Sequence, residues 1–117
     1  MELLINKKIL DIVSTEPKQF QLTLLSIILL IESRSIDKIF TGDIYNAYQD
    51  ICRKTKNEIL TQRRISDIIA EFDMLGIVNA QVISKGRYGR TREIRLNISQ
   101  QIIPKVKDIL NNSLNLT

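Results

Sequence analysis

The chain has 117 residues, 44% hydrophobic and 26% charged, with 17 Lys and Arg against 13 Asp and Glu and a formal net charge of +4. This length fits one domain around one core. The excess of basic residues favours an anionic partner, either nucleic acid or an acidic membrane surface, and the place where the charge is concentrated would be the contact surface. Because there is no histidine and Cys52 is the sole cysteine, the sequence excludes a His/Cys zinc site and an intramolecular disulfide.

The first third of the chain predicts two helices. Residues 2–13 have roughly helical apolar spacing, and residues 14–17 interrupt it with cap and turn chemistry, which predicts a short helix followed by a joint. A second helix is expected from about 17 to 33, with Pro17 in its first turn, where the missing N–H costs nothing. Residues 22–31 are almost wholly apolar but are about half the ~20 residues that cross a bilayer, so this helix should lie at the centre of the core.

A connection over residues 35–40 follows, with room for a short strand at Ile39-Phe40. Thr41 is expected to cap a helix that ends near Thr55. Cys52 lies on the apolar side of this helix, where a buried small hydrophobe is favoured over a reactive thiol.

Thr61 is expected to cap the next helix, and Gly76 to end it. The apolar residues between them follow a 3.6-residue period. They are Ile65, Ile68, Ile69, Phe72 and Leu75.

Beyond Gly76 the period changes from 3.6 to 2. Apolar and polar residues alternate over 78–83 and again over 93–98, which predicts a two-stranded hairpin lying on the helices. A last helix is expected from near Pro104 to Leu110, and residues 111–117 are expected to fray. The predicted fold class is mainly α with a small β-hairpin, a winged helix-turn-helix over residues 17–110.

The helix expected after Thr61 carries the candidate recognition residues at its N-terminal end, where backbone N–H groups and the helix dipole also favour phosphate. They are Thr61, Gln62, Arg63, Arg64 and Ser66. Arg63 can pair with guanine O6 and N7, and Gln62 with adenine N6 and N7. Asp67 and Glu71 lie three and seven positions beyond Arg64, so an ion pair along the helix is expected there, and Arg64 is kept as a phosphate contact.

The predicted hairpin tip, or wing, concentrates positive charge on an exposed turn, which implies an anion that offsets the repulsion. Its candidate residues are Lys85, Gly86, Arg87, Tyr88, Gly89, Arg90 and Arg92. Arg95 adds a further cation and Glu93 is the one acid among them. Residues 86–89 also match the GXXG loop of KH domains, but that loop joins two helices, whereas this one joins two strands.

The sequence does not indicate catalysis. It contains no GxxxxGK[ST] phosphate loop, no GxGxxG after a strand and no histidine for acid–base chemistry. We therefore expect no enzyme activity, no metal and no cofactor in these residues.

The chain resembles the C-terminal winged-helix domain of archaeal replication initiators related to eukaryotic origin-recognition and cell-division-control proteins. The resemblance covers about residues 17–98, and the motifs that carry it are residues 60–69, Asp73-Met74-Leu75-Gly76-Ile77 and Ser84-Lys85-Gly86-Arg87-Tyr88-Gly89-Arg90-Thr91-Arg92-Glu93-Ile94. Thr41-Gly42-Asp43-Ile44-Tyr45 is similar to the start of that domain's second helix.

The resemblance implies binding to duplex origin DNA, with the recognition helix in the major groove and the wing in the adjacent minor groove. It also implies a parent protein with an N-terminal AAA+ module that binds ATP or ADP with Mg²⁺ and helps to load the helicase. Residues 1–16 would then be the joint to that module. Other initiator or replication proteins are further expected partners, a membrane is not, and the expected location is the cytoplasm, at the nucleoid.

Two other functions fit the sequence. The domain could chiefly dock proteins within a replication assembly, through the apolar segments 1–13 and 102–110, because winged helices serve both purposes. A winged-helix transcription regulator would share the DNA chemistry and differ in its sites.

Overall fold

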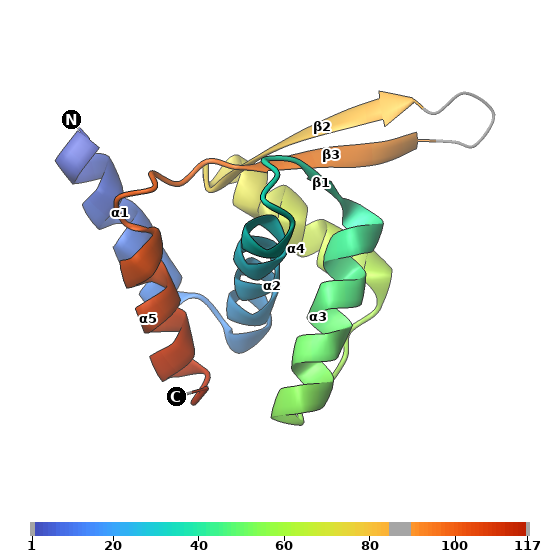
Figure 1. Ribbon diagram of the computed structural model, residues 1–117, viewed down its shortest axis with the longest axis horizontal. Helices are drawn as coiled ribbons and strands as arrows, with labels where there is room; N and C mark the ends of the chain where they lie inside the picture. The colour runs from blue at the N-terminus through green and yellow to red at the C-terminus, as the bar shows by residue number, and fades with distance from the viewer. Residues whose placement is uncertain (1, 85–89, 117) are drawn as a thin grey trace.

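The computed structural model describes residues 2–84 and 90–116 and contains helices below a small sheet (Figure 1). The elements are α1 (Glu2–Thr15), α2 (Lys18–Arg34), β1 (Ile39–Phe40), α3 (Thr41–Thr55), α4 (Gln62–Met74), β2 (Val78–Ser84), β3 (Arg90–Leu96) and α5 (Ile103–Ser113). The predicted order of helices and hairpin strands is confirmed, and so is the winged helix-turn-helix fold class.

Helix α2 is the centre of the core, as its nearly unbroken apolar sequence predicts. Every residue from Gln21 to Ile28 is buried, because α3, α4 and α5 all pack against it. Two buried hydroxyls keep their hydrogen bonds by donating to carbonyls of the same helix: Thr23 to Gln19 and Ser26 to Leu22. No helix within residues 2–84 and 90–116 is long and apolar enough to cross a membrane.

Helices α3 and α4 form the helix-turn-helix. Thr61 caps α4 as predicted, by accepting a hydrogen bond from the Arg64 N–H at 3.3 Å. Beyond its last residue, Met74, Gly76 takes a φ of 78°, which reverses the chain into β2. Cys52 is fully buried in α3, also as predicted, and burial raises the pKa of its thiol.

The predicted cap of α3 is wrong. Thr41 is the first residue of the helix and Phe40 is its N-cap; the carboxylate of Asp43, in the first turn, accepts from the Phe40 N–H at 3.4 Å. A carboxylate is the stronger acceptor and favours the positive end of the helix dipole. The Thr41 hydroxyl is left buried, with no hydrogen-bond partner among the residues the structure describes.

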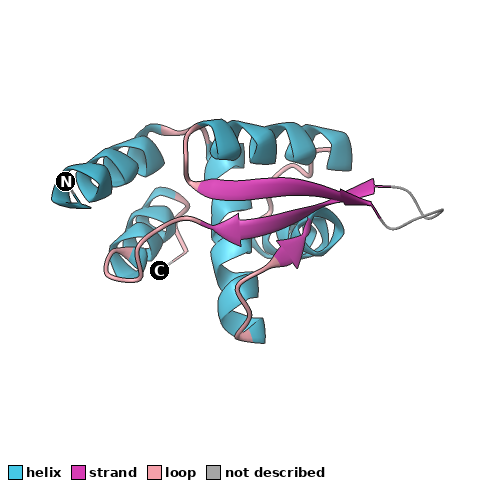
Figure 2. Ribbon diagram, turned by 90° about the horizontal axis from the view of Figure 1, so that it is seen from above, coloured by secondary structure: helices cyan, strands magenta, loops and turns pink. Residues whose placement is uncertain are grey.

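The sheet has three strands in the order β1-β3-β2, one more than the predicted hairpin (Figure 2). Ile39 pairs with Ile94 in β3, and Ala80 in β2 pairs with the same Ile94 from the other side. Ile94 and Val78 are buried on the helices, as the alternation predicts. Because α3 begins directly after β1, the pairing of β1 with β3 fixes the start of α3 beside the hairpin.

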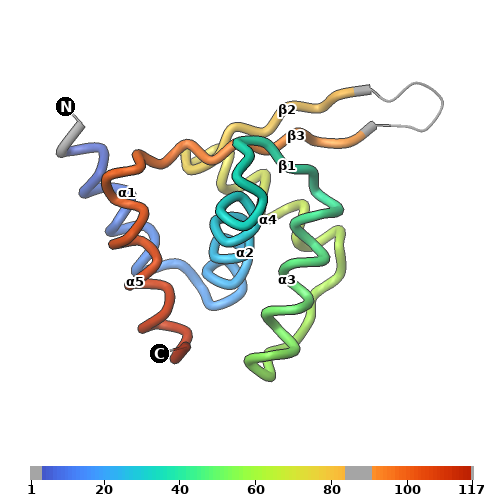
Figure 3. The backbone as a smooth tube through the Cα atoms, in the orientation of Figure 1, coloured from blue at the N-terminus to red at the C-terminus, as the bar shows by residue number. Residues whose placement is uncertain are grey.

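The first and last helices lie side by side, although they are far apart in the sequence (Figure 3). Ile9 and Val13 of α1 and Val106 and Leu110 of α5 are buried. Most of the apolar residues in the two segments expected to dock a partner thus pack inside the domain. Beyond residue 110, where fraying was expected, α5 continues to Ser113 and Leu114 packs into the core, 5% exposed.

Candidate nucleic-acid interface

The N-terminal end of α4 presents three polar side chains to solvent. Gln62, Arg63 and Arg64 are exposed, and none forms a side-chain hydrogen bond or ion pair with another described residue. Ser66, one turn further on, is half-buried. Within the described part of the chain, the capped helix end therefore carries two guanidinium groups without ion pairs and one amide at the positive end of its dipole, an arrangement suited to an anion.

The ion pair expected along α4 is not formed. Neither Asp67 nor Glu71 pairs with Arg64 in the described part of the chain. Exposed pairs on a helix gain little energy and cost side-chain entropy, so a favourable spacing does not ensure contact. Arg64 is consequently as available as Arg63.

A hydrogen-bond network fixes the loop that leads into α4. Tyr48 accepts from the Leu60 N–H at 2.8 Å and donates to Gln19 Oε1 at 2.6 Å, while Gln19 Nε2 donates to the Glu58 carbonyl at 3.0 Å. Tyr45 donates to the Leu60 carbonyl at 2.8 Å and stacks on Tyr48, with ring centroids 5.9 Å apart. Burial raises the pKa of Tyr48 to about 12, so the hydroxyl keeps its proton. The sequence pattern did not indicate a positioning role for these two tyrosines, although their three-residue spacing on α3 places both on one face.

The tip of the predicted wing, Lys85, Gly86, Arg87, Tyr88 and Gly89, lies outside the described residues. The backbone of Arg90 begins β3, paired with Ser84.

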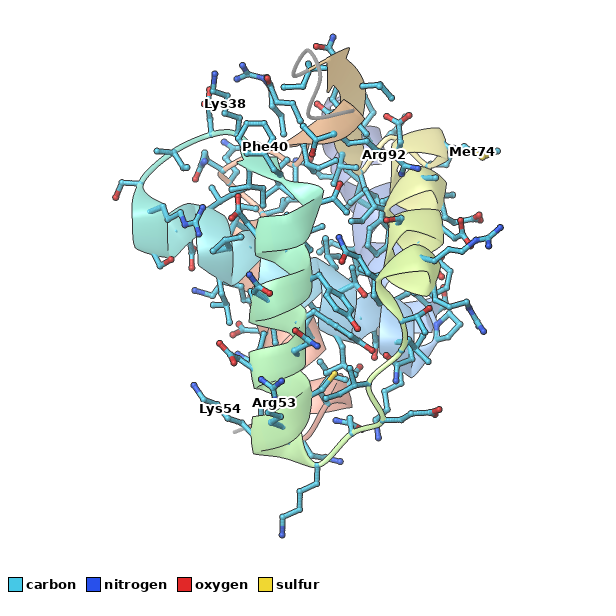
Figure 4. All side chains as sticks on the ribbon, turned by 90° about the vertical axis from the view of Figure 1, so that its right-hand side faces the viewer. Lys38, Phe40, Arg53, Lys54, Met74 and Arg92 are labelled. Atoms are coloured by element: carbon cyan, nitrogen blue, oxygen red, sulfur yellow. The ribbon has the colours of Figure 1, made fainter. Side chains whose placement is uncertain are left out.

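Arg92 lies where β3 passes α4 (Figure 4). It is half-buried, and its Nη1 donates to the Ser66 carbonyl at 2.9 Å. The structure therefore brings Arg92 of β3 into direct contact with α4.

Arg95 is neutralised by two carboxylates. Its Nη1 lies 2.8 Å from Asp37, and its Nη2 lies 3.1 Å from Glu93. Asp37 is 58 residues away in the sequence and so could not be recognised as a partner. Arg95 is therefore less available to an anion than its place in the sequence suggests.

A hollow of about 550 Å³ opens between the recognition helix and the hairpin. Four elements line it, α3, α4, β2 and β3, through Thr41, Gly42, Gln62, Ser66, Val82, Thr91 and Arg92. Three of these, Gln62, Ser66 and Arg92, were predicted to bind DNA. Thr41 and Gly42, at the start of α3, were not predicted to lie there. The Thr-Gly pair at a helix N-terminus is the feature of the sequence that could have indicated them.

The family described as "CDC6, C terminal winged helix domain" matches residues 11–106. The ORC1-type DNA replication protein 4 of Haloarcula marismortui is 50% identical over 91 residues, which are 78% of this chain and 17% of that protein. The ORC1-type DNA replication protein of Pyrococcus horikoshii is 50% identical over 96 residues, 82% of this chain and 23% of that protein. The chain thus spans about a fifth of the length of these relatives.

Two solved structures share the fold. The first, of the Aeropyrum pernix ORC1 protein in complex with DNA, superposes with a TM-score of 0.83 at 35% identity and covers 97% of this chain and 29% of that one. The second, of Drosophila ORC bound to DNA, has a TM-score of 0.70 at 12% identity and covers 83% of this chain and 24% of that one, a likeness of fold alone.

Proposed function

Because the chain belongs to the CDC6 C-terminal winged helix domain family of ORC1-type replication proteins, we propose that it binds double-stranded DNA sequence-specifically at replication origins. The observation that carries the proposal is the exposed group Gln62, Arg63 and Arg64 at the N-terminal end of α4, beside the hairpin, whose side chains pair with no other described residue. The printed description of the Aeropyrum pernix relative, a complex with DNA, supports it.

In the proposed complex, α4 enters the major groove with its N-terminal end first. Arg63 and Gln62 contact base edges, where a bidentate pair contributes about 1–3 kcal/mol of discrimination against a wrong base. Arg64, Thr61 and Ser66 contact phosphates or neighbouring bases. The wing residues Lys85, Arg87, Tyr88 and Arg90, with the turn glycines Gly86 and Gly89, enter the adjacent minor groove, where a planar, weakly hydrated guanidinium suits the negative potential.

The wider setting is part of the same proposal. The curated relatives are four to six times longer than the segments they share with this chain, which make up 17% to 24% of them. We propose that this chain acts as the DNA-reading domain of an initiator whose AAA+ module binds ATP or ADP with Mg²⁺, and that residues 1–16 lead to that module. Other initiator or replication proteins are the proposed partners besides origin repeats, and the cytoplasm, at the nucleoid, is the proposed location.

Footprinting of the chain across the origin regions of its own genome tests the proposal. We expect protected repeats at origins; protection confined to promoters would identify a transcription regulator. Affinity for a protected duplex should fall with salt with a slope of log K against log salt near −4 to −5, from about five phosphate contacts. A slope near zero would contradict DNA binding and favour a docking role. The matched control is Arg53→Ala, since Arg53 is already paired with Asp50 at the far end of α3 and should leave the slope unchanged.

A further inference from the structure

The hollow between the recognition helix and the hairpin contains a polar group without a partner. Thr41 is 9% exposed, and its Oγ1 is buried without a hydrogen bond to any described residue. Buried polar groups are nearly always hydrogen-bonded in folded proteins, so one that is not calls for a ligand or another explanation. Thr41 is also one of the residues that line the hollow.

Gly42, the next residue, points to the same place. Glycine within a helix is less favourable than alanine. A Cβ added at Gly42 would meet nothing within 4 Å, and Gly42 is not among the described glycines with positive φ. The fold therefore has room for a side chain at this position. A ligand that approaches the backbone closely would use that room.

The surroundings select an anion. The hollow lies at the N-terminus of α3, a helix of 15 residues whose first N–H groups have no partners within the helix. Arg92 lines it and uses Nη1 on the Ser66 carbonyl, which leaves further guanidinium N–H groups. No acidic residue is among the described residues that line it, and the nearby Asp43 carboxylate pairs with Arg34 at 3.3 Å.

We propose that this hollow binds one phosphate of the DNA backbone, held by the Thr41 hydroxyl, the first N–H groups of α3 and Arg92. The inference rests on the proposed function. A helix in the major groove and a wing in the adjacent minor groove are separated by one phosphodiester strand, and that strand crosses the protein between α4 and the hairpin, where the hollow opens. The phosphate adds affinity without reading sequence.

The test compares Thr41→Val and Gly42→Ala with the control Thr15→Val. Thr15 is exposed on α1, and its hydroxyl donates to the Asp11 carbonyl of its own helix. Affinity is measured by fluorescence anisotropy on a footprinted duplex and on a random-sequence duplex, at a temperature where circular dichroism shows every variant folded. We expect Thr41→Val and Gly42→Ala to bind both duplexes about tenfold more weakly, since a hydrogen bond to a charged group is lost or blocked. The melting temperatures should not fall, because neither change removes a contact within the protein.

Methylphosphonate duplexes, in which one phosphate at a time is neutral, then identify the group. One position should weaken the binding of the unsubstituted protein, and Thr41→Val should be less sensitive at that position. Wild-type affinity in both variants, with DNA binding intact, would overturn the phosphate site and leave the proposed function standing. An unsubstituted protein that does not bind duplex DNA would instead overturn the proposed function.

Discussion

Arg92 of β3 donates a hydrogen bond to the Ser66 carbonyl of α4 at 2.9 Å. The carbonyl belongs to the exposed first half of the recognition helix, and the arginine to the strand that leads away from the wing tip. The hairpin and the helix are therefore connected by a charge-assisted bond as well as by apolar packing.

Replacing Arg92 with Ala should disturb this connection and remove one cation from the interface. We expect a loss of unfolding free energy of about 1 kcal/mol, since Ser66 is half-buried and water replaces part of the bond. The slope of log K against log salt should become shallower by about one. Chemical denaturation and salt titrations measure the two effects. Arg95→Ala is the matched control, because two carboxylates already neutralise Arg95; an equal change of slope there would contradict a specific role for Arg92.

Arg63→Ala should reduce discrimination between duplexes. We expect affinity for the footprinted site to fall by about 1–3 kcal/mol and affinity for random sequence to fall much less, because a guanine contact is lost. Competition titrations against both duplexes measure the difference. Arg64→Ala provides the comparison on the same helix, and a parallel loss on both duplexes is expected for it. Identical behaviour of the two variants would contradict the assignment of Arg63 to base reading.

The double substitution of Arg87 and Arg90 with Ala should act through affinity alone. We expect weaker binding to all sequences, and a slope of log K against log salt that is shallower by about two, because two phosphate or groove contacts are removed. Retention of affinity on random duplexes would show that the wing contributes little.

Tyr48→Phe should destabilise the loop before α4. The change leaves the Leu60 N–H and Gln19 Oε1 without their partner, which costs about 1–3 kcal/mol of unfolding free energy. Urea denaturation measures it. Tyr45→Phe, which removes a single bond to the Leu60 carbonyl, should cost less. Equal stability of Tyr48→Phe and the unsubstituted protein would show that water satisfies these groups.

Glu16→Gln should stabilise the protein at neutral pH. Desolvation, and then repulsion from Glu71, raises the pKa of Glu16 above its ordinary value of 4.5, so the fold favours the protonated form. Stability from this group is present below pH 4.5 and lost as the pH rises through the higher pKa of the folded state. The gain from Gln should therefore appear above that range and vanish below it. Melting curves at a series of pH values test this, and a gain independent of pH would contradict the cause.

Local patterns were sufficient to predict most of the fold. The nearly unbroken apolar run of α2, the 3.6-residue period of α4 and the alternation in β2 and β3 each predict their element. The pairing of β1 with β3 was not predicted, because Ile39 and Ile94 are far apart in the sequence and a strand of two residues has no period. Thr41 is a favourable N-cap residue by type, and the sequence does not show that Phe40 takes this position instead, with Asp43 in the first turn.

The candidate site was predicted only in part, because local patterns do not show which distant residues meet. The polar start of α4 follows from its own apolar stripe. The network that positions it, and the neutralisation of Arg95 by Asp37, depend on residues that meet only in the folded chain. The burial of Thr41 in the hollow is likewise a tertiary property, although the Thr-Gly pair that marks it is visible in the sequence.

The short strand β1 has a consequence for how a binding site is chosen. Through its pairing with β3 it joins the start of α3 to the hairpin, and Arg92 joins the hairpin to α4, so the three parts of the proposed interface form one frame of fixed spacing. In the proposed complex, the spacing of these parts has to match the distance from one DNA groove to the next. In the proposed complex the DNA adapts to that distance, and base steps that bend or narrow easily are favoured even where no side chain reaches them.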